Sequence, residues 1–141
     1  MATEPFSSSV TSYCFRLRPG QDLKKELIYY CQLHHLHAAC VVSCVGSLNK
    51  AHLRLSNGKD VVEFQGPFEI VSLSGTVNST AAHLHISISD FEGKVLGGHL
   101  MDGSEIYTTA EIMLLENRDL TFQRENDGHT GYKELLIQKR G

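Results

Sequence analysis

The feature that most constrains the fold is a set of strand-like segments that are apolar on both faces. Successive side chains of a strand point to opposite faces. In the segment PFEIVSLSGTV, Phe68 and Ile70 are therefore expected on one face, and Val71 and Leu73 on the other. The segments TTAEIMLLE and ACVVSCV show the same pattern. The side chains expected in a core or an interface are Phe68, Ile70, Val71, Leu73, Ile112, Met113, Leu114 and Leu115.

The sequence offers one clear helix to cover such strands. Pro19-Gly20 ends a first short strand, and Asp22 is the predicted N-cap of a helix that runs to about His34. The face expected to pack inward consists of Leu23, Leu27, Ile28 and Cys31. One helix cannot cover both faces of a sheet. We therefore expect the sheet to curl into a barrel or sandwich, or a second subunit to cover its open face.

The remaining segments predict an α+β fold with one main helix and a mostly antiparallel sheet. The 141 residues suit a single domain, which we place at residues 13–141 after a loosely held or disordered segment, 1–12. Asn57-Gly58 marks a turn, and KELLIQK is expected to end the sheet. The predicted strands after the helix are AACVVSCVGSL, KAHLRLS, DVVEFQ, PFEIVSLSGTV, the hairpin HLHISISDFEGKVLGGHL, EIYTTAEIMLLE, LTFQRE and KELLIQK.

The hairpin contains three histidines whose spacing depends on its turn. His83 and His85 are two residues apart, so they share a strand face. A three-residue loop, Phe91–Gly93, places His99 directly opposite His85 and on the same face. A two-residue loop would shift the register and send His99 to the other face. We predict the three-residue loop, which puts all three histidines on one face.

Three converging imidazoles predict a divalent metal site. Zinc accepts three neutral histidines and keeps a fourth position for water or a substrate. Nickel, iron(II) and cobalt accept the same ligands. Gly97-Gly98 remove side chains where another backbone or a ligand comes close. The alternative is a polar sheet face that holds histidines without a metal.

The other histidines and the cysteines favour structural roles. His34, His35 and His37 follow the helix, where cationic groups are favourable. His52 and His129 are isolated and expected at the surface. The four cysteines lack a C-x-x-C pattern and are expected to be small core residues: Cys14, Cys31, Cys40 and Cys44.

Charge and targeting signals exclude several classes of protein. The formal net charge is −3, without the basic excess of a nucleic-acid binder. The start MATEPFSSSV has no basic or apolar region of a signal peptide, and no apolar run reaches membrane-spanning length. We expect a protein of the cytoplasm or nucleus that is not secreted.

Five segments together resemble the PPC (plants-and-prokaryotes conserved) domain: RLRPGQDL, VGSLNKAHLRL, GPFEIVSLSGTV, HLHISISDFEGKVLGGHL and YTTAEIMLLE. The resemblance implies an α+β domain that assembles as a homotrimer. It also implies that His83, His85 and His99 bind a divalent metal, usually taken as zinc. Plant members carry an AT-hook of RGRP type, which these 141 residues lack, and Pro67 replaces an arginine of their partner-contact segment.

Three functions remain open from the sequence. The first is a metal-binding homotrimer of unassigned biochemical role, with a small-molecule ligand possible at the metal. The second is a metal-dependent hydrolase that uses a metal-bound water. Its candidate acid, base or anion-binding groups are Glu111, Arg16, Arg18 and Tyr107. The third, DNA binding, is disfavoured by the charge and the missing AT-hook.

Overall fold

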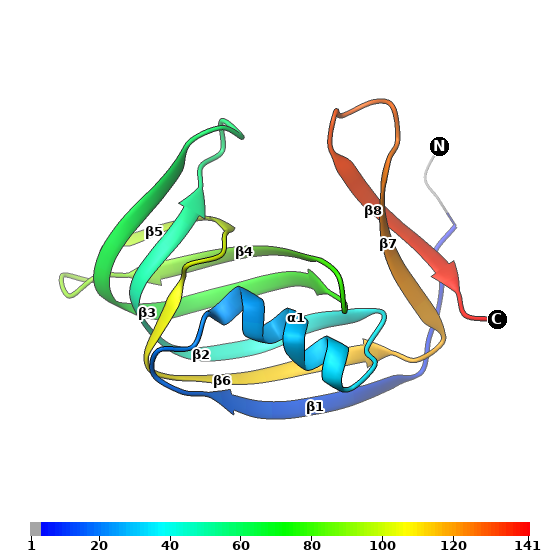
Figure 1. The fold of residues 1–141 in the computed structure, drawn as a ribbon, viewed down its shortest axis with the longest axis horizontal. Helices are drawn as coiled ribbons and strands as arrows, with labels where there is room; N and C mark the ends of the chain where they lie inside the picture. The colour runs from blue at the N-terminus through cyan, green and yellow to red at the C-terminus, as the bar shows by residue number, and fades with distance from the viewer. Residues whose placement is uncertain (1–3) are drawn as a thin grey trace.

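The computed structural model of the chain describes residues 4–141. It has the predicted α+β fold, one helix with antiparallel strands (Figure 1). The elements are β1 (Val10–Leu17), α1 (Leu23–Leu33), β2 (Ala39–Arg54), β3 (Val61–Val77), β4 (Ala82–Ser89), β5 (Val95–Leu100), β6 (Glu105–Asn117), β7 (Leu120–Asn126) and β8 (Lys133–Lys139).

The main sheet curls back on itself, which was one of the two arrangements expected from its two-faced strands. Its six strands have the order β1-β6-β2-β3-β4-β5, and β5 pairs a second time with the end of β2. In that second pairing Leu53 lies opposite Leu100 and Arg54 opposite His99. Strands β2 to β5 therefore form a closed ring, visible at the left of Figure 1.

Helix α1 covers the inner side of the sheet, as predicted (Figure 1). The side chain of Asp22 accepts a hydrogen bond from the Lys25 backbone N–H at 3.1 Å, so Asp22 is the N-cap. Leu23, Leu27 and Cys31 are fully buried in the core. One amphipathic helix therefore anchors one face of the sheet.

Two strands are longer than the sequence indicates, and a bulge changes one predicted face. Strand β3 continues through Gly66-Pro67, where a break was expected. An irregularity between Ile70 and Ser72 adds one residue, which reverses the alternation after it. Leu73 consequently lies in the core with Ile70, so its predicted place on the face opposite Ile70 was wrong. Strand β2 likewise runs unbroken past Leu48, with a register shift there.

The strand faces turned away from the core still display apolar side chains. In β6, Ile112 is buried, whereas Met113 is 38% exposed. Val42, Val45 and Val71 are each at least half exposed. Curling of the sheet therefore covers only part of the apolar surface.

Strands β7 and β8 form a separate two-stranded arm, so the prediction that KELLIQK ends the main sheet was wrong. The arm stands apart from the main sheet in Figure 1 and is fastened at its base. The buried Glu116 carboxylate accepts the backbone N–H groups of His37 and Ala38, each at 3.0 Å, and forms an ion pair with Arg140. The Asn78 side chain donates to the Phe122 carbonyl at 2.7 Å.

The N-terminal segment is held from Ser8 onward, because the Ser8 hydroxyl accepts a hydrogen bond from the Asp119 backbone N–H at 3.0 Å. Residues 1–3 of the predicted loose segment lie outside the described residues. The Ser9 backbone N–H donates to the Asp119 carboxylate at 2.7 Å, and Val10 already pairs with Asn117. The paired structure therefore begins three residues before Tyr13, the boundary expected from the sequence.

Candidate metal centre

The β4–β5 hairpin has the register predicted from its odd-length turn. Asp90 and Lys94 flank the loop, which is closed by the Asp90 N–H donating to the Lys94 carbonyl at 3.0 Å. Gly93 has φ of +81°, a conformation that glycine adopts without steric cost. His85 lies directly opposite His99. The local turn therefore places the third histidine on the face of the first two.

The three imidazoles gather into one cluster with the spacing of a metal site. One ring nitrogen from each of His83, His85 and His99 lies within 4.8 Å of the other two. The Nε2 atoms of His83 and His85 are 3.3 Å apart. Tetrahedral zinc with bonds of 2.0–2.1 Å separates its ligand atoms by about 3.3–3.4 Å. The donor set and this separation both fit a metal ion.

The surroundings keep two of these imidazoles neutral, which is the form that binds a metal. Burial, together with a smaller effect in the same direction from the nearby Arg54, lowers the pKa of His99 to about 4. Burial also lowers the pKa of His83, with a contribution from Arg124. The Nδ1 atom of His99 is buried and has no hydrogen-bond partner within the described chain. A metal ion bound at this nitrogen would supply the partner that Nδ1 lacks.

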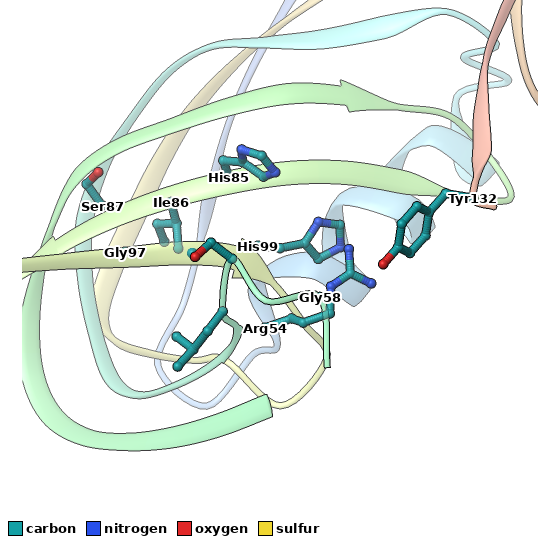
Figure 2. Close-up of a pocket in the computed structure, with 11 residues that line it drawn as sticks. Arg54, Gly58, His85, Ile86, Ser87, Gly97, His99 and Tyr132 are labelled. Carbon is teal, nitrogen blue, oxygen red and sulfur yellow. The ribbon is translucent and has the colours of Figure 1, made fainter. Parts of the chain in front are cut away.

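A cavity of about 770 Å³ opens beside the cluster (Figure 2). His85 and His99 form part of its wall, the turn after β2 contributes Ser56 and Gly58, and Tyr132 of the arm closes one side. A Cβ atom at Gly58 would lie 2.6 Å from the Tyr132 hydroxyl. The turn and the arm are therefore in close contact across the mouth of the cavity.

The paired glycines of β5 allow strands to approach closely, and both also line the cavity of about 770 Å³. A Cβ atom at Gly97 would lie 2.4 Å from the Ile86 carbonyl oxygen, and one at Gly98 would lie 2.8 Å from the Arg54 carbonyl oxygen. Both obstacles are backbone atoms of neighbouring strands. The glycines thus serve the closure of the ring that carries His99.

Strand β2 and the arm add charged groups that the sequence did not identify. Arg54, Arg124, Tyr132 and Glu134 line a second cavity of about 290 Å³ together with His83 and His99. Arg54 reaches the histidines because β2 pairs with β5, and Arg124 because the arm folds back. Both contacts join segments far apart in the chain. No local pattern of residues could have predicted them.

The polar candidates suggested for a hydrolase lie elsewhere. Arg16 in β1 lies opposite Glu111 in β6 in the strand register. The Arg16 Nε atom donates to the Thr109 hydroxyl at 2.8 Å. Tyr107 lines a separate hollow of about 220 Å³ with Phe91. Neither these three nor Arg18 line the cavities at the histidines. The structure therefore does not bring the predicted catalytic candidates to the histidine cluster.

The other histidines and cysteines form no comparable cluster of three within residues 4–141. His34 caps the end of α1, and His52 is hydrogen-bonded to Glu63 rather than free at the surface. Burial raises the pKa of the Cys31 and Cys44 thiols to about 12, as suits core residues. Cys14 is exposed, so its predicted core position was wrong; Cys40 is half-buried.

Comparison with known proteins identifies similar chains across bacteria, archaea and plants. The family model described as the Plants and Prokaryotes Conserved (PCC) domain matches residues 5–118. A hypothetical protein from Salmonella has a TM-score of 0.93 and 38% identity, covering 96% of this chain and 98% of its own. A protein from Archaeoglobus fulgidus, described as metal-containing, has a TM-score of 0.80 and 27% identity, covering 95% and 99%.

The curated relatives are longer proteins. A bifunctional protein GlmU from Synechococcus sp. (strain JA-3-3Ab) is 43% identical over 133 residues, which are 94% of this chain and 21% of that protein. AT-hook motif nuclear-localized protein 13 from Arabidopsis thaliana is 28% identical, over 68% of this chain and 25% of that protein. The chain spans about a fifth to a quarter of these relatives. Within the described part of the chain, no helix has the length and apolar character needed to cross a bilayer.

Proposed function

Because the chain belongs to the Plants and Prokaryotes Conserved (PCC) domain family, we propose that it binds one divalent metal ion through His83, His85 and His99. The observation that carries the proposal is the convergence of three ring nitrogens within 4.8 Å on one sheet face. A similar structure described as metal-containing supports it.

The proposed metal is zinc. Three neutral imidazoles match its preference for nitrogen ligands, and a three-ligand set leaves one position for a further group. The cavity beside His85 and His99 gives a small molecule access to that position. Nickel, iron(II) and cobalt are the competing ions for the same ligands. Elemental analysis of the purified protein identifies which of these ions is bound.

The proposed assembly is a homotrimer. Val42, Val45, Val71 and Met113 leave apolar surface exposed on the strands, which favours association. Burying apolar area contributes about 25 cal/mol per Å². The number three comes from the resemblance to the family, because exposed apolar surface alone predicts only that chains associate.

A metal-dependent hydrolase is the second candidate function. A bound zinc ion would supply Lewis-acid chemistry to a carbonyl or phosphoryl group. Glu134 lines two of the cavities at the histidines and is the carboxylate best placed to accept a proton there. Its Oε1 atom accepts a hydrogen bond from the Thr130 hydroxyl at 2.7 Å, which would orient it. Glu134 therefore replaces Glu111 as the proposed proton acceptor of a hydrolase.

Sequence-selective DNA binding is not part of the proposed function. The net charge of −3 opposes contact with a polyanion. We expect only weak, salt-sensitive binding to A·T-rich duplex at about 150 mM salt. Selective binding tighter than about micromolar in a fluorescence-anisotropy titration would contradict this expectation. The proposed location remains the cytoplasm or nucleus.

The metal proposal is tested by elemental analysis and zinc titration of protein freed of any affinity tag. We expect one zinc per chain in the wild type. His85→Ala is expected to weaken zinc binding by at least about 100-fold, because removing a ligand costs more than removing a supporting hydrogen bond. His129→Ala is the matched control, since His129 lies outside the cluster. Equal zinc affinity in the two variants would reject the site.

A further inference from the structure

Two arginines beside the histidine cluster lack an acidic partner within the described residues. The ion pairs there join other groups, and neither Arg54 nor Arg124 takes part in one. The Nη2 atom of Arg124 donates to the Thr76 hydroxyl at 2.9 Å. The guanidinium of Arg54 lies 5.8 Å from the centre of the Tyr132 ring. Most of their hydrogen-bond donors are therefore available to a ligand.

Both arginines line one of the cavities at the histidine cluster. Figure 2 shows Arg54 extending between His99 and Tyr132. Arg124 and Arg54 line the second cavity together with His83 and His99. Glu134 is the one carboxylate in that lining, against Arg54, Arg124 and Lys133. The wall of the site therefore carries an excess of positive charge on a chain whose overall charge is negative.

A metal ion would increase this imbalance. Three neutral imidazoles leave the full double charge of a divalent ion uncompensated, and the histidine cluster contains no carboxylate or thiolate. Anions are attracted to a site where a metal ion and guanidinium groups converge. A guanidinium offers two parallel N–H donors that match the oxygen spacing of carboxylate and phosphate groups.

We propose that the second cavity, of about 290 Å³, binds the oxyanion group, a carboxylate or a phosphate, of a small molecule, with Arg54 and Arg124 as its side-chain donors. The metal part of this recognition rests on the proposed function, whereas the arginines belong to the chain itself. The larger cavity of about 770 Å³ shares Arg54, His99 and Tyr132 with the second cavity, so the rest of the ligand lies in it, along Ser56 and Ser87. This volume lies within the range of small-molecule sites.

The test titrates inorganic phosphate and malonate separately into zinc-loaded and metal-free protein by isothermal calorimetry, at constant ionic strength. We expect one of the two anions to bind to the zinc-loaded wild type. Arg124→Gln and Arg54→Gln are each expected to weaken that binding by at least about tenfold, because charge-assisted hydrogen bonds are lost. Arg118→Gln removes the same charge from an exposed position and is expected to leave binding unchanged.

The outcomes separate this inference from the metal proposal. Zinc bound at one per chain with neither anion binding would overturn the oxyanion site and leave the metal site standing. Arginine-dependent anion binding in protein that takes up no zinc would support the oxyanion site and reject the metal site. Equal weakening by Arg118→Gln would overturn the inference, because it would indicate a general charge effect. Tighter binding of duplex DNA than of either anion would overturn the small-molecule assignment.

Discussion

At the scale of single residues, the centre depends on imidazoles that stay neutral. The folded pKa of His99 is about 4, against about 6.5 for an unperturbed histidine. Between these values the unfolded chain binds a proton that the folded chain does not, so stability falls as pH drops from about 6.5 towards 4. The burial that prepares His99 for a metal therefore destabilises the metal-free fold in acid.

We predict that the metal-free protein loses stability across this pH range and that His99→Gln reduces the loss, because glutamine does not titrate. Urea denaturation in the presence of a chelator at several pH values measures the slope. His129→Gln is the control, since His129 is exposed and outside the cluster. Identical slopes for wild type and His99→Gln would show that His99 does not cause the loss.

At the scale of elements, the hairpin needs two glycines for different physical reasons. Gly93 lies in the turn at φ +81° with no atom within 4 Å of an added Cβ, so alanine there would cost only backbone strain. Gly97 lies in β5, where an added Cβ would meet the Ile86 backbone at 2.4 Å. One glycine permits the turn, and the other permits the strand pairing that positions His99.

We predict that Gly93→Ala destabilises the protein by about 1 kcal/mol and leaves zinc binding intact. Gly97→Ala is expected to destabilise more and to weaken zinc binding, because β4 and β5 must separate locally. Chemical denaturation and zinc titration of both variants measure the two effects. If Gly97→Ala bound zinc as tightly as Gly93→Ala, the close pairing at Gly97 would not control the site.

The arm depends on one buried carboxylate. Glu116 accepts two backbone N–H groups and pairs with Arg140, so Glu116→Gln removes the charge that all three donors share. We predict a loss of about 2–3 kcal/mol in stability. Hydrogen exchange is expected to accelerate in β7 and β8 before the main sheet. Glu125→Gln, at an exposed position of β7, is the control and is expected to change neither quantity.

At the scale of the whole molecule, the exposed apolar strands predict association. Val71 is 55% exposed in the single chain, so Val71→Asp costs the isolated fold little but would bury a charge in an interface. Ile70 is unsuitable for this test because it is 5% exposed and belongs to the core. Strand alternation puts these neighbours on opposite faces, and their burial in the folded chain shows which of them faces the core.

We predict that light scattering coupled to size exclusion gives three times the chain mass of 15.7 kDa for the wild type and a smaller mass for Val71→Asp. Circular dichroism controls for unfolding of the variant. A wild-type mass of one chain would reject association, and a mass of two chains would reject the number three. An unchanged trimer in Val71→Asp would place the interface on another face.

The sequence by itself determined the features that depend on neighbours along the chain. The helix capped by Asp22 follows from local spacing, and so does the hairpin that sets His85 opposite His99. A turn of given length permits one register, so three histidines could be predicted on one face. The local pattern failed at Leu73, where an extra residue reversed the alternation of the strand.

Only the tertiary structure decided which other groups meet the histidines. Arg54 lies beside His99 because β5 closes onto β2, and Arg124 lies there because the arm folds back. Each contact joins residues separated by tens of positions, and hydrophobic periodicity shows which face is buried but not which distant strand covers it. Pairing between distant strands depends on how the whole core packs. The charge around the candidate metal centre is therefore a property of the folded chain.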